Sequence, residues 1–126
     1  RCSRDWSSDV CSSDLINRDE AVAVALILNE LILNAVKHSP EQGGAPRVCV
    51  DADGASAHVV IRNARLGHGV FDLASGAGLS TGLRLVKSLL PEQGAALDFV
   101  GEADAGLATH LRLTAPVVQA IARKAR

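Results

Sequence analysis

The sequence predicts an α+β fold in which helices cover a sheet as a two-layer sandwich. Two stretches carry apolar residues at helical spacing, residues 18–38 and 79–90, and each is followed by a stretch typical of a β-hairpin, residues 47–63 and 96–114. Strands that follow one another in this way pair antiparallel, and no parallel βαβ unit is evident. A chain of 126 residues is long enough for one modest domain with one core.

The first helix is predicted to begin after Asn17 and to end near His38. Asn17 is a good capping residue, and Glu20 stands three positions on, as in a capping box. Ser39 precedes Pro40, and the residue before a proline is pushed out of the α region. No apolar run approaches the length needed to span a bilayer, and Asn29, Glu30 and Asn34 interrupt this stretch, so we expect a core helix.

One polar stripe runs along this otherwise apolar helix. Glu30 and Asn34 are four residues apart, and Lys37 and His38 follow at three and four more, so all four share one face. A stripe facing water is the simplest interpretation. The alternative is more specific, because a carboxylate, an amide, a cation and an imidazole along one line can hold a metal ion and a phosphate chain.

The remaining elements are predicted from turn signals and periodicity. Asp53-Gly54 indicates the turn of the first hairpin. Residues 64–75 lack periodicity and are expected to form a mobile loop. Residues 76–82 are rich in glycine and open the second helix, which Pro91 ends. Residues 116–126 are predicted to form a short amphipathic tail helix.

Residues 1–15 are expected to be an artefactual or disordered tail, which leaves residues 16–126 as the domain. They resemble one translated reading frame of a common sequencing-library adapter, and otherwise read as a Ser/Asp-rich disordered segment. Setting them aside leaves Cys49 as the one remaining cysteine, so no disulfide and a reducing compartment are expected. Acidic and basic residues then balance, which argues against general attraction to nucleic acid or a membrane surface.

The glycine segment is a second candidate feature. Glycines let a backbone approach a ligand closely, and the helix that follows offers unpaired N–H groups to phosphate. A Rossmann site is excluded because no strand runs into the glycines, and a P-loop is excluded because no Gly-Lys-Ser/Thr ends the run. Between the two features, Asn63 ends a predicted strand, where it either reads the edge of a base or simply forms a turn.

Taken together and in this order, these segments resemble the catalytic ATP-binding domain of sensor histidine kinases. The stretch Asn29-Glu-Leu-x-x-Asn-Ala-x-Lys-His38 is similar to the N box of that family, and Gly76-x-Gly-Leu-x-x-Gly82 to its second glycine box. The resemblance covers residues 16–116 and extends to type II topoisomerases, Hsp90 and mismatch-repair ATPases. It implies a Bergerat-type fold, with a mixed sheet and helices on one face.

The resemblance also implies roles for single residues. Asn34 would bind Mg²⁺ through its side-chain oxygen, Glu30 would be the catalytic base, and Lys37 and His38 would neutralise phosphate charge. Residues 64–75 would be a lid over ATP, and Asn63 would accept a hydrogen bond from adenine. The segment that binds the triphosphate would contain Gly76, Gly78, Leu79, Ser80, Thr81 and Gly82.

Departures from the family pattern leave alternatives open. Asn63 stands where the family usually has Asp, and Ser80 stands where a glycine is common. A degenerate nucleotide-binding or protein-interaction module is therefore a second hypothesis, and an anti-sigma-type serine kinase is a third.

As a histidine kinase domain, the chain is expected to be cytoplasmic, although the full protein could be membrane-bound. It is expected to be truncated at its N-terminus and, alone, unable to phosphorylate itself. Its partners would be a dimerisation domain that bears the acceptor histidine and a response regulator, with no nucleic acid and no direct membrane contact.

Overall fold

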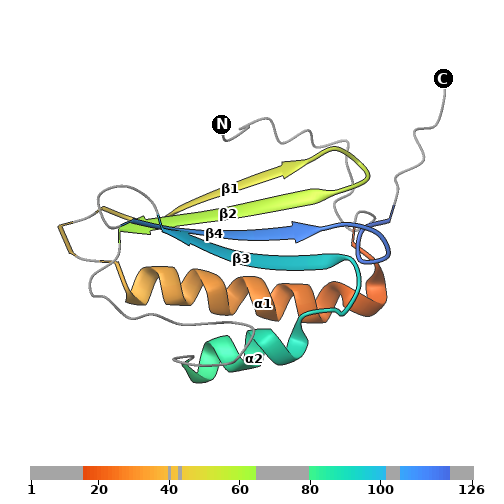
Figure 1. The fold of residues 1–126 in the computed structure, drawn as a ribbon, viewed down its shortest axis with the longest axis horizontal. Helices are drawn as coiled ribbons and strands as arrows, with labels where there is room; N and C mark the ends of the chain where they lie inside the picture. The colour runs from red at the N-terminus through yellow and green to blue at the C-terminus, as the bar shows by residue number, and fades with distance from the viewer. Residues whose placement is uncertain (1–15, 40, 43, 65–79, 102–105, 120–126) are drawn as a thin grey trace.

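Two helices lie on one face of a four-stranded antiparallel sheet (Figure 1). The computed structural model describes residues 16–39, 41–42, 44–64, 80–101 and 106–119. Its elements in chain order are α1 (Arg18–Lys37), β1 (Arg47–Ala52), β2 (Ala57–Ala64), α2 (Thr81–Leu89), β3 (Ala95–Gly101) and β4 (Gly106–Leu113). The predicted α+β sandwich with helices on one face is confirmed. The sheet order is β1-β2-β4-β3, and each pairing between described strands is antiparallel. A mixed sheet was expected, but the described strands include no parallel pair.

Helix α1 begins as predicted, and its N-terminal cap also involves the segment that follows β4. The Asn17 side chain accepts a hydrogen bond from the Asp19 N–H at 3.2 Å, which satisfies one of the free donors of the first turn. The Asn17 N–H donates to the Val117 carbonyl at 2.8 Å. In a complete capping box that donor would pair with the Glu20 side chain. The α1 cap therefore ties residues 16–17 to the segment after β4.

The turn between β1 and β2 is formed by the predicted Asp53-Gly54 pair. The Asp53 carboxylate accepts hydrogen bonds from the Ala55 and Ser56 N–H groups at 2.9 and 2.8 Å. Gly54 has a φ of 88°, a conformation that residues with a Cβ adopt only at a cost. These contacts set the register in which Ala52 faces Ala57.

Two sequence-based expectations were wrong. Residues 115–118 form a turn followed by an isolated bridge from Val118 to Ile16, where a tail helix starting at Pro116 was predicted. Cys49 is disulfide-bonded, where no disulfide was expected. The rest of the expected tail helix, residues 120–126, and the expected N-terminal tail, residues 1–15, lie outside the described residues.

The core lies between the helices and the sheet. Ile27 of α1 and Val86 of α2 are buried against Ile61 of β2 and Leu111 of β4. Both described helices lie on this side of the sheet, and the strand residues that alternate with the core residues point to the other side. Within the described ranges, no helix combines the length and apolarity that crossing a membrane requires.

The ends of two helices and one strand lie at the same end of the molecule (Figure 1). The C-terminus of α1, the C-terminus of β2 and the N-terminus of α2 all lie there, on the left in this view. The hairpin turn between β1 and β2 lies at the opposite end. The fold therefore brings the polar part of α1, Asn63 and the start of α2 to a common region.

Candidate functional site

The polar stripe of α1 meets the first turn of α2 at Gly82. A Cβ placed on Gly82 would lie 2.5 Å from the Glu30 Oε2 and 4.0 Å from the Asn34 Oδ1. The φ of Gly82 is not in the left-handed region, so the backbone does not require glycine. Glycine leaves room for the Glu30 carboxylate, because a side chain at this position would force the flexible end of Glu30 to move aside.

Asn34 carries an unsatisfied polar atom at this junction. Its side chain is half-buried, and its Nδ2 is buried without a hydrogen-bond partner among the described residues. A buried donor without an acceptor costs about 1–3 kcal/mol of stability. Such a group commonly marks a place where a ligand supplies the missing partner.

The start of α2 offers backbone donors beside these side chains. Ser80 caps the helix, because its hydroxyl accepts from the Leu83 N–H at 3.3 Å while its carbonyl accepts from the Arg84 N–H at 2.9 Å. The N–H groups of Thr81 and Gly82 have no acceptor within the described part of the chain. These donors and the positive end of the helix dipole favour an anion here.

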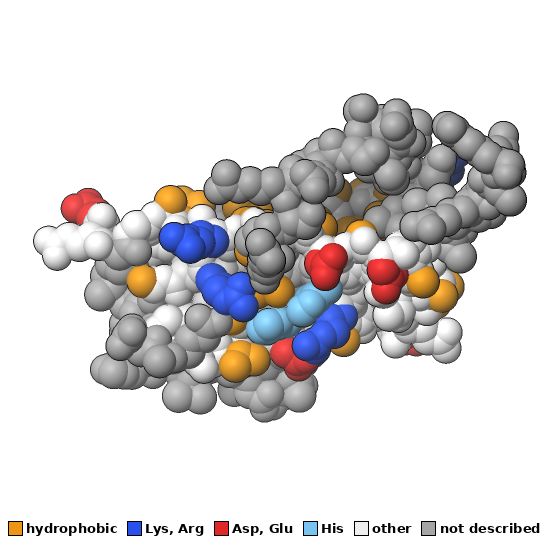
Figure 2. Space-filling view, turned by 90° about the horizontal axis from the view of Figure 1, so that it is seen from above, with side chains coloured by type: hydrophobic (Ala, Val, Ile, Leu, Met, Phe, Trp, Pro, Cys, Tyr) orange, Lys and Arg blue, Asp and Glu red, His pale blue; other side chains and the backbone are white. Residues whose placement is uncertain are grey.

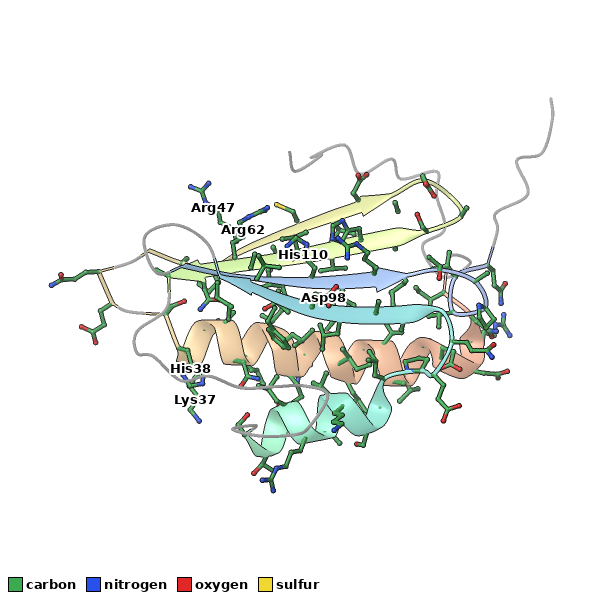
Figure 3. The ribbon with its side chains drawn as sticks, in the orientation of Figure 1. Lys37, His38, Arg47, Arg62, Asp98 and His110 are labelled. Carbon is green, nitrogen blue, oxygen red and sulfur yellow. The ribbon has the colours of Figure 1, made fainter. Side chains whose placement is uncertain are left out.

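Lys37 and His38, predicted to offset phosphate charge, lie at the exposed end of α1 (Figure 3). Lys37 is the last residue of the helix, and His38 is its C-cap, with its N–H donating to the Asn34 carbonyl at 3.0 Å. Positive charge is favourable at this end of a helix. Both side chains are exposed, so the Lys37 ammonium and the His38 ring are accessible to a solvent-borne ligand.

Asn63 occupies the end of β2 on the side of the helices. It alternates with the buried residues Val59 and Ile61 and pairs with Leu107 of β4. Its side chain is half-buried, and its Nδ2 makes one long hydrogen bond, 3.5 Å, to the Ala64 carbonyl. The Oδ1 receives no hydrogen bond from a described residue, so it can accept one from a ligand.

The structure thus brings Glu30, Asn34 and Gly82 into direct proximity and places Asn63, Lys37 and His38 at the same end of the fold. The remaining predicted site residues Gly76, Gly78 and Leu79 lie outside the described residues, as does the predicted lid except Ala64. No cluster of three or more His, Cys, Asp or Glu residues with metal-binding geometry occurs in the described ranges.

The sequence reasoning missed the local role of Ser80. It treated this residue as a departure from the glycine common in the family. The structure shows a helix cap, and the signal was present, because a serine directly before an apolar run of helical period is typical of an N-terminus.

Three solved structures illustrate what this fold is similar to. The mycobacterial sensor histidine kinase MprB matches with a TM-score of 0.57 at 24% identity, covering 80% of this chain and 74% of that one. The histidine kinase domain of the Erythrobacter litoralis EL346 blue-light activated kinase matches with a TM-score of 0.60 at 17% identity, covering 76% of this chain and 45% of that one. Full-length ShkA, in a complex with AMPPNP, matches with a TM-score of 0.58 at 24% identity, covering 82% of this chain and 23% of that one.

No protein-family model matches the sequence, and no curated protein matches it significantly. The chain spans less than half the length of the EL346 and ShkA structures. These similarities establish the architecture: the chain has the fold of the catalytic domains of sensor histidine kinases.

Proposed function

We propose that this chain binds MgATP at the junction of α1 and α2 and serves as the catalytic domain of a two-component sensor histidine kinase. One observation carries the proposal. Gly82 lets α2 approach Glu30 and Asn34 so closely that a carboxylate, an amide and a helix N-terminus converge, and the amide has a buried atom without a partner. Packed structural contacts leave few such atoms unpaired, and a phosphate oxygen would supply the acceptor that this amide nitrogen lacks.

The residues at this junction fit a magnesium ion. Mg²⁺ prefers oxygen ligands and usually retains waters and phosphate oxygens, so it needs only one or two protein groups. Asn34 supplies an amide oxygen for the ion, while the Glu30 carboxylate beside Gly82 stays available to the acceptor. When bound, the ion would neutralise charge on the transferring phosphoryl group.

The remaining groups would position nucleotide. The N–H groups of Thr81 and Gly82 would donate to phosphate oxygens, and Lys37 and His38 would offset their charge. Asn63 would accept a hydrogen bond from the adenine amino group. Phosphoryl transfer depends mainly on such positioning and on stabilising charge.

Glu30 would act on the acceptor. Its carboxylate would receive the proton of the attacking imidazole, or orient that ring, as the γ-phosphoryl group is transferred. The acceptor histidine would belong to a dimerisation domain of a longer protein, and a response regulator would take the phosphoryl group from it. The cytoplasm is where such a domain would meet both partners.

The proposal is tested by calorimetric titration of AMPPNP into the chain, with and without Mg²⁺. We expect binding that depends on Mg²⁺ and that Asn34→Ala weakens by at least tenfold. Asn29→Ala is the matched control, because Asn29 is exposed on the same helix and lies outside the junction.

Three results would decide against the proposal. Folded protein that binds no nucleotide would favour a degenerate module. This alternative was raised because Asn63 stands where the family usually has Asp. Equal loss in Asn29→Ala and Asn34→Ala would show a nonspecific effect on α1. Transfer to a protein serine, with none to histidine, would identify the anti-sigma type of kinase.

A further inference from the structure

Two histidines contact each other on the sheet face that the helices leave uncovered. His58 of β2 and His110 of β4 are 52 residues apart in sequence, and the His58 Nε2 lies 3.0 Å from the His110 Nδ1. The ring centroids are 5.2 Å apart and the ring planes are inclined by 26°. Figure 2 shows two pale-blue histidine side chains side by side on this face, among basic and acidic groups.

The facing nitrogens limit how many protons the pair can carry. A hydrogen bond between two imidazole nitrogens needs a donor N–H on one and a lone pair on the other. The bond therefore exists when both rings are neutral or when one is charged. When both rings are protonated, two N–H groups and two positive charges face each other at 3.0 Å, and the bond is lost.

The surrounding charges increase this effect. Arg112 lies directly across from His58 on β4, and Arg62 lies four residues along β2 on the same face. Figure 3 shows Arg47, Arg62 and His110 on the side of the sheet away from the helices.

Two acidic groups on this face oppose that positive charge. Asp51 of β1 faces His58. Asp98 of β3 faces His110, but it is already paired with Arg112 at 3.3 Å. Arg112 is therefore the strongest of these charges at His58, and Asp51 opposes it.

We propose that the His58–His110 pair is a proton-sensitive lock between β2 and β4, closed near neutral pH and opened when both rings become charged. The two strands it joins are the central pair of the sheet. Opening the lock adds charge to the sheet face opposite the helices and weakens the packing of β2 against β4. The junction of α1 and α2 is on the other side of the sheet and is not altered.

The electrostatics agree in direction with this geometry. Burial, then Arg112, then His110 hold the pKa of His58 below its ordinary value, while Asp51 opposes them. The unfolded chain therefore binds a proton more readily than the folded chain as the pH falls below about 6.5. The contribution of neutral His58 to the free energy of unfolding is fully present above that pH. It is lost progressively as the pH falls toward the lowered pKa.

The first test measures melting temperature between pH 8 and pH 5 for the wild type, His58→Gln, His110→Gln and the double variant. The wild type is expected to lose about 5 °C more than the double variant over this range. The coupling between the two positions should favour the wild-type pair at pH 8 and vanish at pH 5. An equal loss in the wild type and the double variant would overturn the proposal.

The second test follows the ring resonances of each histidine by NMR and does not depend on the double variant folding. In the wild type the His58 midpoint should lie below about 6.5. His110→Gln should raise the His58 midpoint, because it removes the second charge. Independent titration at ordinary values, unchanged by His110→Gln, would refute the lock.

Discussion

If the proposed function is correct, replacing Gly82 with alanine should separate nucleotide binding from phosphoryl transfer. The new Cβ would lie 2.5 Å from the Glu30 Oε2, where an unstrained carbon–oxygen contact needs about 3.3 Å. The Glu30 carboxylate must therefore move by roughly 1 Å. The same Cβ would lie 4.0 Å from the Asn34 Oδ1, an ordinary contact, so Asn34 can stay in place.

The stability of this variant should change little. Alanine in a helix is favoured over glycine by up to about 1 kcal/mol, and Gly82 has a backbone conformation that alanine can adopt. Moving the flexible end of Glu30 off its rotamer costs about 0.5–1.5 kcal/mol. These contributions nearly cancel, so the melting temperature should stay within about 5 °C of the wild type.

The activity should change much more. A reacting group misplaced by about 1 Å can lower a rate on the order of 100-fold. We expect Gly82→Ala to bind MgAMPPNP within about threefold of the wild type by calorimetry. This corresponds to a difference of about 0.6 kcal/mol in binding free energy. Transfer from radiolabelled ATP to the acceptor domain should fall on the order of 100-fold.

Two comparison variants give this result its meaning. Glu30→Gln should reproduce the loss of transfer without a new contact. Gly101→Ala is the neutral control, because no atom lies within 4 Å of a Cβ at that position. Wild-type transfer by Gly82→Ala would show that the position of the Glu30 carboxylate is irrelevant. A loss of nucleotide binding in that variant would refute the assignment of separate roles to Glu30 and Asn34.

Three further predictions concern other parts of the chain. Asn63→Ala should weaken ATP binding about tenfold and reduce its preference over GTP, measured by competition calorimetry; unchanged selectivity would remove Asn63 from the base site. Ser80→Ala should destabilise the protein by about 1 kcal/mol in thermal unfolding, whereas Ser80→Gly should cost only a few tenths, and equal losses would contradict the capping role. Backbone donors of Ala55 and Ser56 hold the pKa of Asp53 below its ordinary value, so Asp53→Ala should lower the melting temperature above pH ~3.9. That difference should disappear as the pH falls through the lowered pKa, and a difference independent of pH would argue against it.

Features set by neighbouring residues could be predicted from the sequence. The Asn17 cap depends on Asp19, and the turn at Asp53-Gly54 depends on residues two and three positions on. The polar stripe of α1 follows from helical spacing alone. Each of these interactions closes within a few residues, so spacing and residue type were sufficient to find it.

Contacts between distant segments could not be derived in this way. The proximity of Gly82 to Glu30 depends on how α2 packs on α1, and the family resemblance suggested a common site without indicating that contact. The pairing of Asn17 with Val117 replaces half of a capping box that the local sequence favoured. The contact between His58 and His110 requires the strand order β2-β4, which neither hairpin reveals alone.

The central claim is that a metal–nucleotide complex sits between Asn34 and the first turn of α2. The most direct measurement is an NMR spectrum of the chain with AMPPNP in which paramagnetic Mn²⁺ replaces Mg²⁺. We expect selective broadening of the Asn34 side-chain amide and the Gly82 N–H, with the Asp53-Gly54 turn at the far end of the sheet left sharp. Broadening centred on that turn, or no broadening at Asn34 and Gly82 when nucleotide is bound, would contradict the account.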